Sequence, residues 1–169
     1  MNKMAFFLVM AFAVLSPTVE APGGTADDPQ RIDKFVWEGL EVPLGKSLQD
    51  LRRIGRVQRE VVSSVPNPHD NSQVDEIRTI FFDGLVVEAY FPNKNHDRFL
   101  LREVTVTKQR WRVREGLSVG VRAALITEAL GAPTETTQNS YKYCGETECV
   151  IFQLRRGVIS KITFQYYVD

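Results

Sequence analysis

Apolar side chains recur every three or four residues in two stretches of the chain, 47–62 and 125–130. This spacing places them on one side of an α-helix and therefore predicts helical structure. Ser47 is a candidate N-cap for the first stretch, and Gly55 within it predicts a break between two short helical pieces. The second stretch should end at Gly131, because glycine readily adopts the C-cap conformation and a proline follows two residues later.

Six further runs have the composition and alternation of β-strands, three after each helical stretch: 77–82, 85–91, 99–111, 140–144, 149–155 and 158–168. Asp83 and Gly84 separate the first two runs and predict a tight type I′ hairpin, a turn in which both central residues need a positive φ. Arg156 and Gly157 are expected to form another hairpin turn. The polar stretch 63–73 contains two prolines and predicts a loop.

Alternation within these runs predicts which side chains face the core. The inward set is Leu85, Val87, Ala89, Phe91, Val104, Val106, Ile162, Phe164 and Tyr166. The outward side chains should form a polar face that carries aromatic residues, a combination favoured in protein-binding surfaces. The predicted protein-binding face comprises Glu88, Tyr90, Thr105, Thr107, Gln109, Trp111 and Tyr167. Two alternatives stay open: a solvated face with incidental aromatics, and burial of Trp111 under the linker between repeats.

A short string in the sequence occurs twice. Glu-Gly-Leu-x-Val spans 38–42 and again 115–119, and a glycine follows each copy, at Gly45 and at Gly120. A helical stretch, a second glycine and three strand-like runs come after both copies in the same order. A shared order of elements after a shared string indicates an internal duplication.

The duplication predicts an α+β fold of two tandem repeats, each a short helical unit followed by a three-stranded antiparallel meander, with the helices on one face of the sheet or sheets. The first repeat is placed at 35–112 and the second at 113–169. The polar segment 27–34 before them shows no apolar periodicity and is expected to be flexible.

This arrangement resembles the tandem repeats of the β-lactamase inhibitory protein family. The second half also looks like the small outer-membrane lipoproteins that accompany the barrel-assembly machinery. The segments that carry the resemblance are 116–120 before the helix, 130–133 after it and the closing strand 157–167. The resemblance implies a sheet that packs one face on its helices and leaves the other face open to partners.

The N-terminal segment 1–26 is identified as a signal peptide. Lys3 provides a positive charge and 5–16 is an apolar run, too short for a membrane span, which needs about 20 apolar residues. Small residues at the third-last and last positions favour cleavage after Ala26. A buried helix is the alternative interpretation. Because no cysteine lies near the cleavage site to accept a lipid, the mature chain is expected to lack a membrane anchor and to be periplasmic or secreted.

Cys144 and Cys149 are the two cysteines of the sequence. In an exported protein a close pair predicts a disulfide, which would stabilise its turn by about 2 kcal/mol. A reactive thiol pair is the alternative, although redox sites normally place two residues between the cysteines. Metal binding would require further ligands.

The composition is that of a globular domain, and 21 basic residues balance 21 acidic ones, so no net charge favours nucleic acid. His69 and His96 both lie in polar turns and are expected to be surface histidines. No motif implies catalysis, a metal or a cofactor. The sequence therefore predicts an exported, non-enzymatic module that binds a protein partner, in its most concrete form an inhibitor or immunity protein. An envelope assembly accessory and a thiol-dependent enzyme are the alternative functions.

Overall fold

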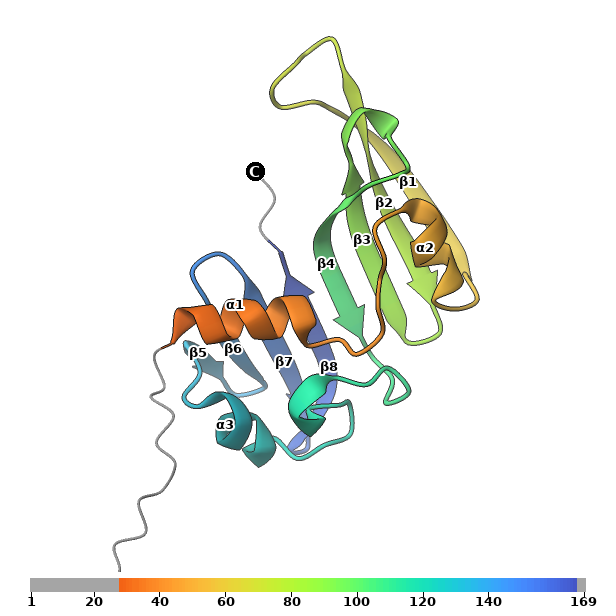
Figure 1. Cartoon of the computed structure of the whole chain (residues 1–169). Coiled ribbons are helices and arrows are strands. Elements are labelled where there is room, and N and C mark those ends of the chain that lie inside the picture. The colour runs from red at the N-terminus through yellow and green to blue at the C-terminus, as the bar shows by residue number, and fades with distance from the viewer. Residues whose placement is uncertain (1–27, 167–169) are drawn as a thin grey trace, which may run out of the picture.

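The computed structural model describes residues 28–166 and has an eight-stranded antiparallel sheet with the strand order β1-β2-β3-β4-β8-β7-β6-β5 (Figure 1). The strands are β1 Arg59–Pro66, β2 Val74–Phe82, β3 Leu85–Phe91, β4 Leu100–Val106, β5 Glu135–Thr137, β6 Ser140–Cys144, β7 Cys149–Arg155 and β8 Val158–Gln165. The helices are α1 Pro29–Glu38, α2 Leu48–Arg53 and α3 Ala124–Leu130, with 3₁₀ turns η1 Pro92–Lys94 and η2 Arg114–Gly116. The predicted α+β class with an antiparallel sheet is confirmed.

The sheet consists of two meanders that meet at its centre. Strands β1–β4, the first half, are consecutive in sequence and in space, and so are β5–β8, the second half. The halves join where β4 pairs with β8, with Val104 opposite Phe164 and Thr105 opposite Thr163. In Figure 1, α1 crosses the second half of the sheet and α2 lies beside the first half.

One face of the sheet carries the hydrophobic core. Cross-strand neighbours share a face, and a central row of directly paired residues is almost completely buried: Ile80, Val87, Val104, Phe164, Val150 and Tyr143. Helix α1 adds Phe35, whose ring centroid lies 6.4 Å from that of Phe152 and 6.1 Å from that of Phe164. All the residues predicted to face inward are buried in this core.

Helix α1 corrects the prediction of a flexible segment at 27–34. The helix begins at Pro29, and the side chain of Asp28 caps it by accepting the backbone N–H of Gln30 at 3.1 Å. Ile32, Phe35 and Val36 then bury one side of the helix. The boundary predicted between 34 and 35 separated Ile32 from the other two, so the apolar side was not recognised in the sequence.

Of the two helical pieces predicted within 47–62, the first is confirmed and the second is wrong. Ser47 caps α2, accepting the backbone N–H of Asp50 at 3.2 Å while the Asp50 carboxylate accepts the backbone N–H of Ser47 at 3.1 Å. The helical piece predicted after Gly55 is wrong, because the chain forms β1 there. This strand is rich in β-branched valines and is held by pairing with β2, a partner that local spacing does not reveal.

Each half therefore contains four strands and not three. Strand β1 begins the first half, and the three-residue β5 begins the second, where every residue is exposed and no apolar pattern marks it. The strand predicted at 99–111 also ends early, at Val106, because the chain turns so that Trp111 N–H donates to the carbonyl of Lys108 at 3.2 Å.

The predicted turns are present with one change in type. Phe82 pairs with Leu85 across Asp83 and Gly84. Gly84 has a positive φ of 79° but Asp83 does not, and a type I′ turn needs a positive φ at both residues, so the turn is of another type. Arg156 and Gly157 have φ values of 55° and 77°, as a type I′ turn requires. Helix α3 ends at Gly131 as predicted, with φ of 83° and its N–H bonded to the carbonyl of Thr127 at 3.0 Å.

Candidate functional site

The face opposite the core is lined by two rows of directly paired side chains that cross the sheet, and we call it the outward face. The first row is Phe81, Val86, Thr105, Thr163, Ile151 and Lys142. The second row is Val61, Thr79, Glu88, Glu103 and Gln165. The guanidinium of Arg59 lies 4.0 Å from the centroid of the Phe81 ring and extends the first row to the edge strand.

Apolar and polar groups are divided unevenly along the first row. Phe81 and Val86 form its apolar part in the first half of the sheet, both partly exposed. Thr105 and Thr163 follow at the seam with their hydroxyls 3.3 Å apart. Thr163 is only 6% exposed although it faces away from the core, so side chains around it already enclose the centre of this face.

Hydrogen bonds fix the polar groups of the second row. Thr105 Oγ1 donates to Glu103 Oε1 at 3.1 Å, and the guanidinium of Arg102 lies 3.1 Å from Glu88 Oε1. Glu88 and Glu103 are directly opposite each other on β3 and β4. These contacts hold the two carboxylates in defined positions despite their like charge.

The residues of the predicted binding face are only partly brought together. Glu88 and Thr105 lie in the outward rows, as expected. Thr107 and Gln109 are exposed but follow the end of β4, so they lie outside the rows. Tyr167 lies outside the described residues.

Tyr90 is on the outward side of β3, but its hydroxyl is engaged within the protein. It donates a hydrogen bond to the carboxylate of Asp75, which also accepts the backbone N–H of Asn93 at 2.7 Å. Burial, reinforced by the nearby Asp75, raises the pKa of Tyr90 to about 12. Tyr90 therefore fixes the turn after β3 and offers a partner part of its ring, not a free hydroxyl.

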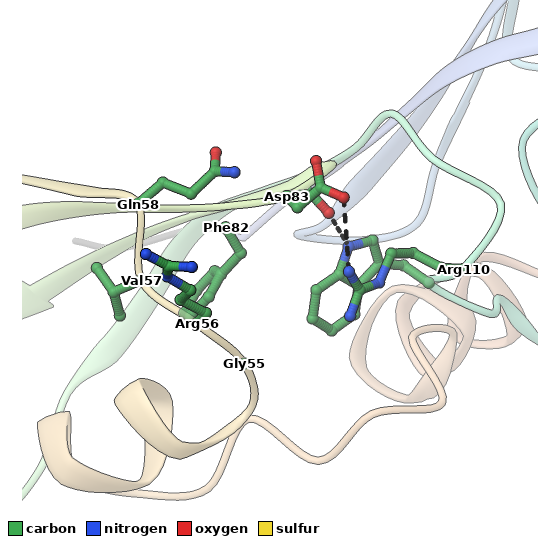
Figure 2. Close-up of a pocket in the computed structure, with 8 residues that line it drawn as sticks. Gly55, Arg56, Val57, Gln58, Phe82, Asp83 and Arg110 are labelled. Atoms are coloured by element: carbon green, nitrogen blue, oxygen red, sulfur yellow. Dashed lines mark hydrogen bonds and ion pairs between the residues drawn. The ribbon is translucent and has the colours of Figure 1, made fainter.

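Trp111 corrects the predicted binding face most clearly. Its side chain is buried, 6% exposed, with its ring centroid 6.2 Å from that of Phe82 on the core side. The indole N–H donates to the carbonyl of Asp83 at 2.8 Å. The alternation that placed Trp111 outward does not apply, because β4 ends at Val106. With Asp83 and Gly55 the ring lines a pocket at the end of the first half (Figure 2).

A buried network of charges on the core side of β1 and β2 was not recognised in the sequence. Arg78, whose side chain is 11% exposed, pairs with Glu60 and Glu76, each at 2.6 Å. His96 lies 3.1 Å from the same Glu76 carboxylate and is itself largely exposed, as predicted. Although burial opposes it, these carboxylates raise the pKa of Arg78. The spacing of Glu76 and Arg78 at i and i+2 on one strand face was the available signal.

Cys144 and Cys149 form a disulfide with an S–S distance of 2.09 Å between directly paired residues of β6 and β7, confirming the predicted pairing. The turn between them contacts α1. Backbone N–H groups of Glu146 and Glu148 donate to the carboxylate of Asp33 at 2.9 and 3.1 Å. Burial opposes ionisation, but these N–H groups outweigh it and lower the pKa of Asp33.

The chain matches no family model, and comparison with curated proteins and with solved structures returns no significant match. Over residues 28–166 no helix is both long and apolar enough to cross a bilayer. The predicted signal peptide lies outside the described residues. The site is therefore interpreted from its own geometry.

Proposed function

We propose that the protein is an exported, non-enzymatic module that binds a protein partner through its outward face, with an inhibitor or immunity protein as the most concrete form. The observation that supports this most directly is the row that runs from Phe81 and Val86 to Thr105 and Thr163. It combines apolar side chains with hydroxyls on a continuous hydrogen-bonded sheet. Protein interfaces likewise combine apolar and polar side chains.

The rigidity of the outward face also favours a protein partner. Its side chains are carried by paired strands and fixed by bonds such as that between Thr105 and Glu103, so little conformational entropy would be lost on binding. The Arg59 guanidinium stacked on Phe81 supplies a cation beside an aromatic ring at one end of the row. Arginine and aromatic side chains are enriched among residues that dominate binding energy.

The proposal includes two tandem repeats with their helices on one face of the sheet. Support comes from the two consecutive four-stranded meanders and from Gly45 and Gly120, which follow the repeated strings and have φ values of 76° and 93°. The repeated strings themselves differ in conformation, since Glu38 ends α1 whereas Glu115 has a φ of 58°. The two glycines, which share a positive φ, therefore support the duplication better than the repeated strings do.

Export is part of the same proposal. The disulfide between Cys144 and Cys149 is compatible with an oxidising compartment such as the periplasm or the extracellular space. Both sulfurs are used in this bond, so a thiol-dependent activity would require its reduction. Titration of the native protein with a thiol reagent should find no reactive cysteine.

The outward face is tested by placing a charge in its apolar part. Val86→Arg should weaken partner capture from envelope and secreted fractions at least tenfold, because the new guanidinium would enter the apolar part of the row. Leu125→Arg is the matched control, since Leu125 is an exposed apolar residue of α3 away from the sheet. Capture is measured by quantitative mass spectrometry, with circular dichroism to establish that both variants fold. Undiminished capture by folded Val86→Arg would exclude this face.

A further inference from the structure

A pocket of about 610 Å³ lies at the end of the first half, between the loop after α2, the β2–β3 turn and the segment that follows β4. Its size is within the range of small-molecule sites. Val57, Phe82 and Trp111 provide apolar lining, and Arg56 and Arg110 provide two guanidinium groups. Figure 2 shows Arg56 next to Val57 on one side and Arg110 next to Asp83 on the other, with Phe82 and Asp83 carried on the hairpin behind them.

The charges of the pocket are unbalanced towards the positive. Among the described residues that line the pocket, Asp83 is the acidic one. Its carboxylate is bound by Lys108 at 2.5 Å and approached by Arg110 at 3.5 Å. The ion pair with Lys108 is the main reason why the pKa of Asp83 is lowered. Within 28–166, Arg56 forms no ion pair, so one guanidinium remains for an anionic ligand.

The shape of the pocket is held by contacts within the protein. The indole N–H of Trp111 is bonded to the carbonyl of Asp83, which fixes the ring against Phe82. Gly55 keeps the adjacent space free: a Cβ atom there would lie 3.5 Å from the Trp111 ring and 3.6 Å from the Phe82 ring. A methyl group would fit, whereas a longer side chain would occupy the pocket.

We propose that this pocket binds a carboxylate joined to an apolar side chain, the chemical group found in N-acylated hydrophobic amino acids and at the C-terminus of a peptide that ends in one. The carboxylate would pair with Arg56, because a guanidinium presents parallel N–H donors that match its two oxygens. The apolar side chain would pack on Phe82 and Val57. The site is separate from the outward face, so either proposal can fail without the other.

The test uses N-acetyl-leucine as the probe and the indole N–H resonance of Trp111 as the reporter. Trp37→Phe removes the other tryptophan, so a single indole signal remains. This signal should shift and saturate with a dissociation constant of about a millimolar, as expected for a ligand of roughly a dozen non-hydrogen atoms. N-acetyl-leucine amide lacks the charge and acetate lacks the apolar group, and both should bind at least tenfold more weakly.

Two matched pairs of variants locate the binding. Arg56→Gln should weaken binding about tenfold through loss of a charged hydrogen bond, whereas Arg98→Gln, an exposed arginine outside the pocket, should not change it. Gly55→Leu should abolish binding and Gly55→Ala should preserve it. No saturable shift, equal binding of the amide, or unchanged binding by both Arg56→Gln and Gly55→Leu would overturn the proposal.

A final comparison separates the two sources of the carboxylate. A hexapeptide ending in leucine is titrated beside its C-terminally amidated form under the same conditions. Tighter binding of the free-acid peptide than of N-acetyl-leucine supports recognition of a protein C-terminus, and equal affinity supports recognition of the terminal group alone. Equal binding of the amidated peptide would contradict carboxylate recognition altogether.

Discussion

At the scale of single residues, Asp33 connects the first helix to the disulfide turn. Asp33→Ala removes a carboxylate that accepts the backbone N–H groups of Glu146 and Glu148. We expect a loss of about 1–3 kcal/mol in the free energy of unfolding at pH 7, the usual contribution of hydrogen bonds to a charged group. Urea denaturation of the two proteins measures it. Asp33→Asn retains one acceptor oxygen and should lose less.

The same residue gives the effect a defined pH dependence. The pKa of Asp33 is lowered in the folded protein from its ordinary value of 3.8. The stabilisation is therefore fully present above that value and is lost as the pH falls below it, through the lower pKa of the folded state. The difference between wild type and Asp33→Ala should shrink in that range. A difference that stays constant to pH 2 would contradict this account.

Whether the sequence predicted the position of a site residue correctly depends on how close that residue lies to the end of its strand. Glu88 and Thr105 lie near the middle of their strands, where alternation determines the face, and both were placed correctly. Trp111 lies five residues beyond the end of β4, where alternation no longer applies. Arg78 was overlooked because its partners Glu60 and His96 are distant in sequence and are brought to it only by folding.

At the scale of elements, the disulfide and α1 are expected to stabilise each other. Reducing the Cys144–Cys149 bond, or replacing both residues by alanine, should cost about 2 kcal/mol from the small loop alone. The turn that it closes also carries the N–H groups that bind Asp33, so the effects of the double cysteine variant and of Asp33→Ala should be less than additive. A double-mutant cycle measures the coupling, and strict additivity would show that the turn keeps its shape without the bond.

Elements with a strong local signal were predictable, and the others depend on tertiary contacts. The runs 85–91, 140–144 and 149–155 coincide with strands because alternation and turn residues bound them on both sides. Strand β1 was assigned to a helix and a loop, since its residues from Val61 to Ser64 are exposed and its pairing with β2 is non-local. Helix α1 was missed because the predicted boundary between 34 and 35 separated Ile32 from Phe35 and Val36, the residues that form its apolar side.

At the scale of the whole molecule, the two halves share one hydrophobic core. The β4–β8 seam pairs Val104 with Phe164, and both belong to the same buried cluster as Phe82 in the first half and Phe152 in the second. Tyr166 adds a further link, since its backbone N–H donates to the carbonyl of Arg102 at 2.9 Å and its hydroxyl to that of Val36 at 3.1 Å. Neither half can therefore lose its structure without exposing apolar surface of the other.

This shared core predicts a single cooperative unfolding transition. Trp111 reports on the first half, and Trp37, whose ring centroid lies 4.9 Å from that of Tyr166, reports on α1 and the second. In Trp37→Phe and in Trp111→Phe alike, the fluorescence midpoint in urea should coincide with the circular dichroism midpoint of the same variant. Val104→Ala at the seam should lower the free energy of unfolding reported by both probes by roughly 2 kcal/mol, because it leaves a cavity bordered by both halves. A fluorescence midpoint that differs from the circular dichroism midpoint of the same variant would instead identify the halves as independent folding units.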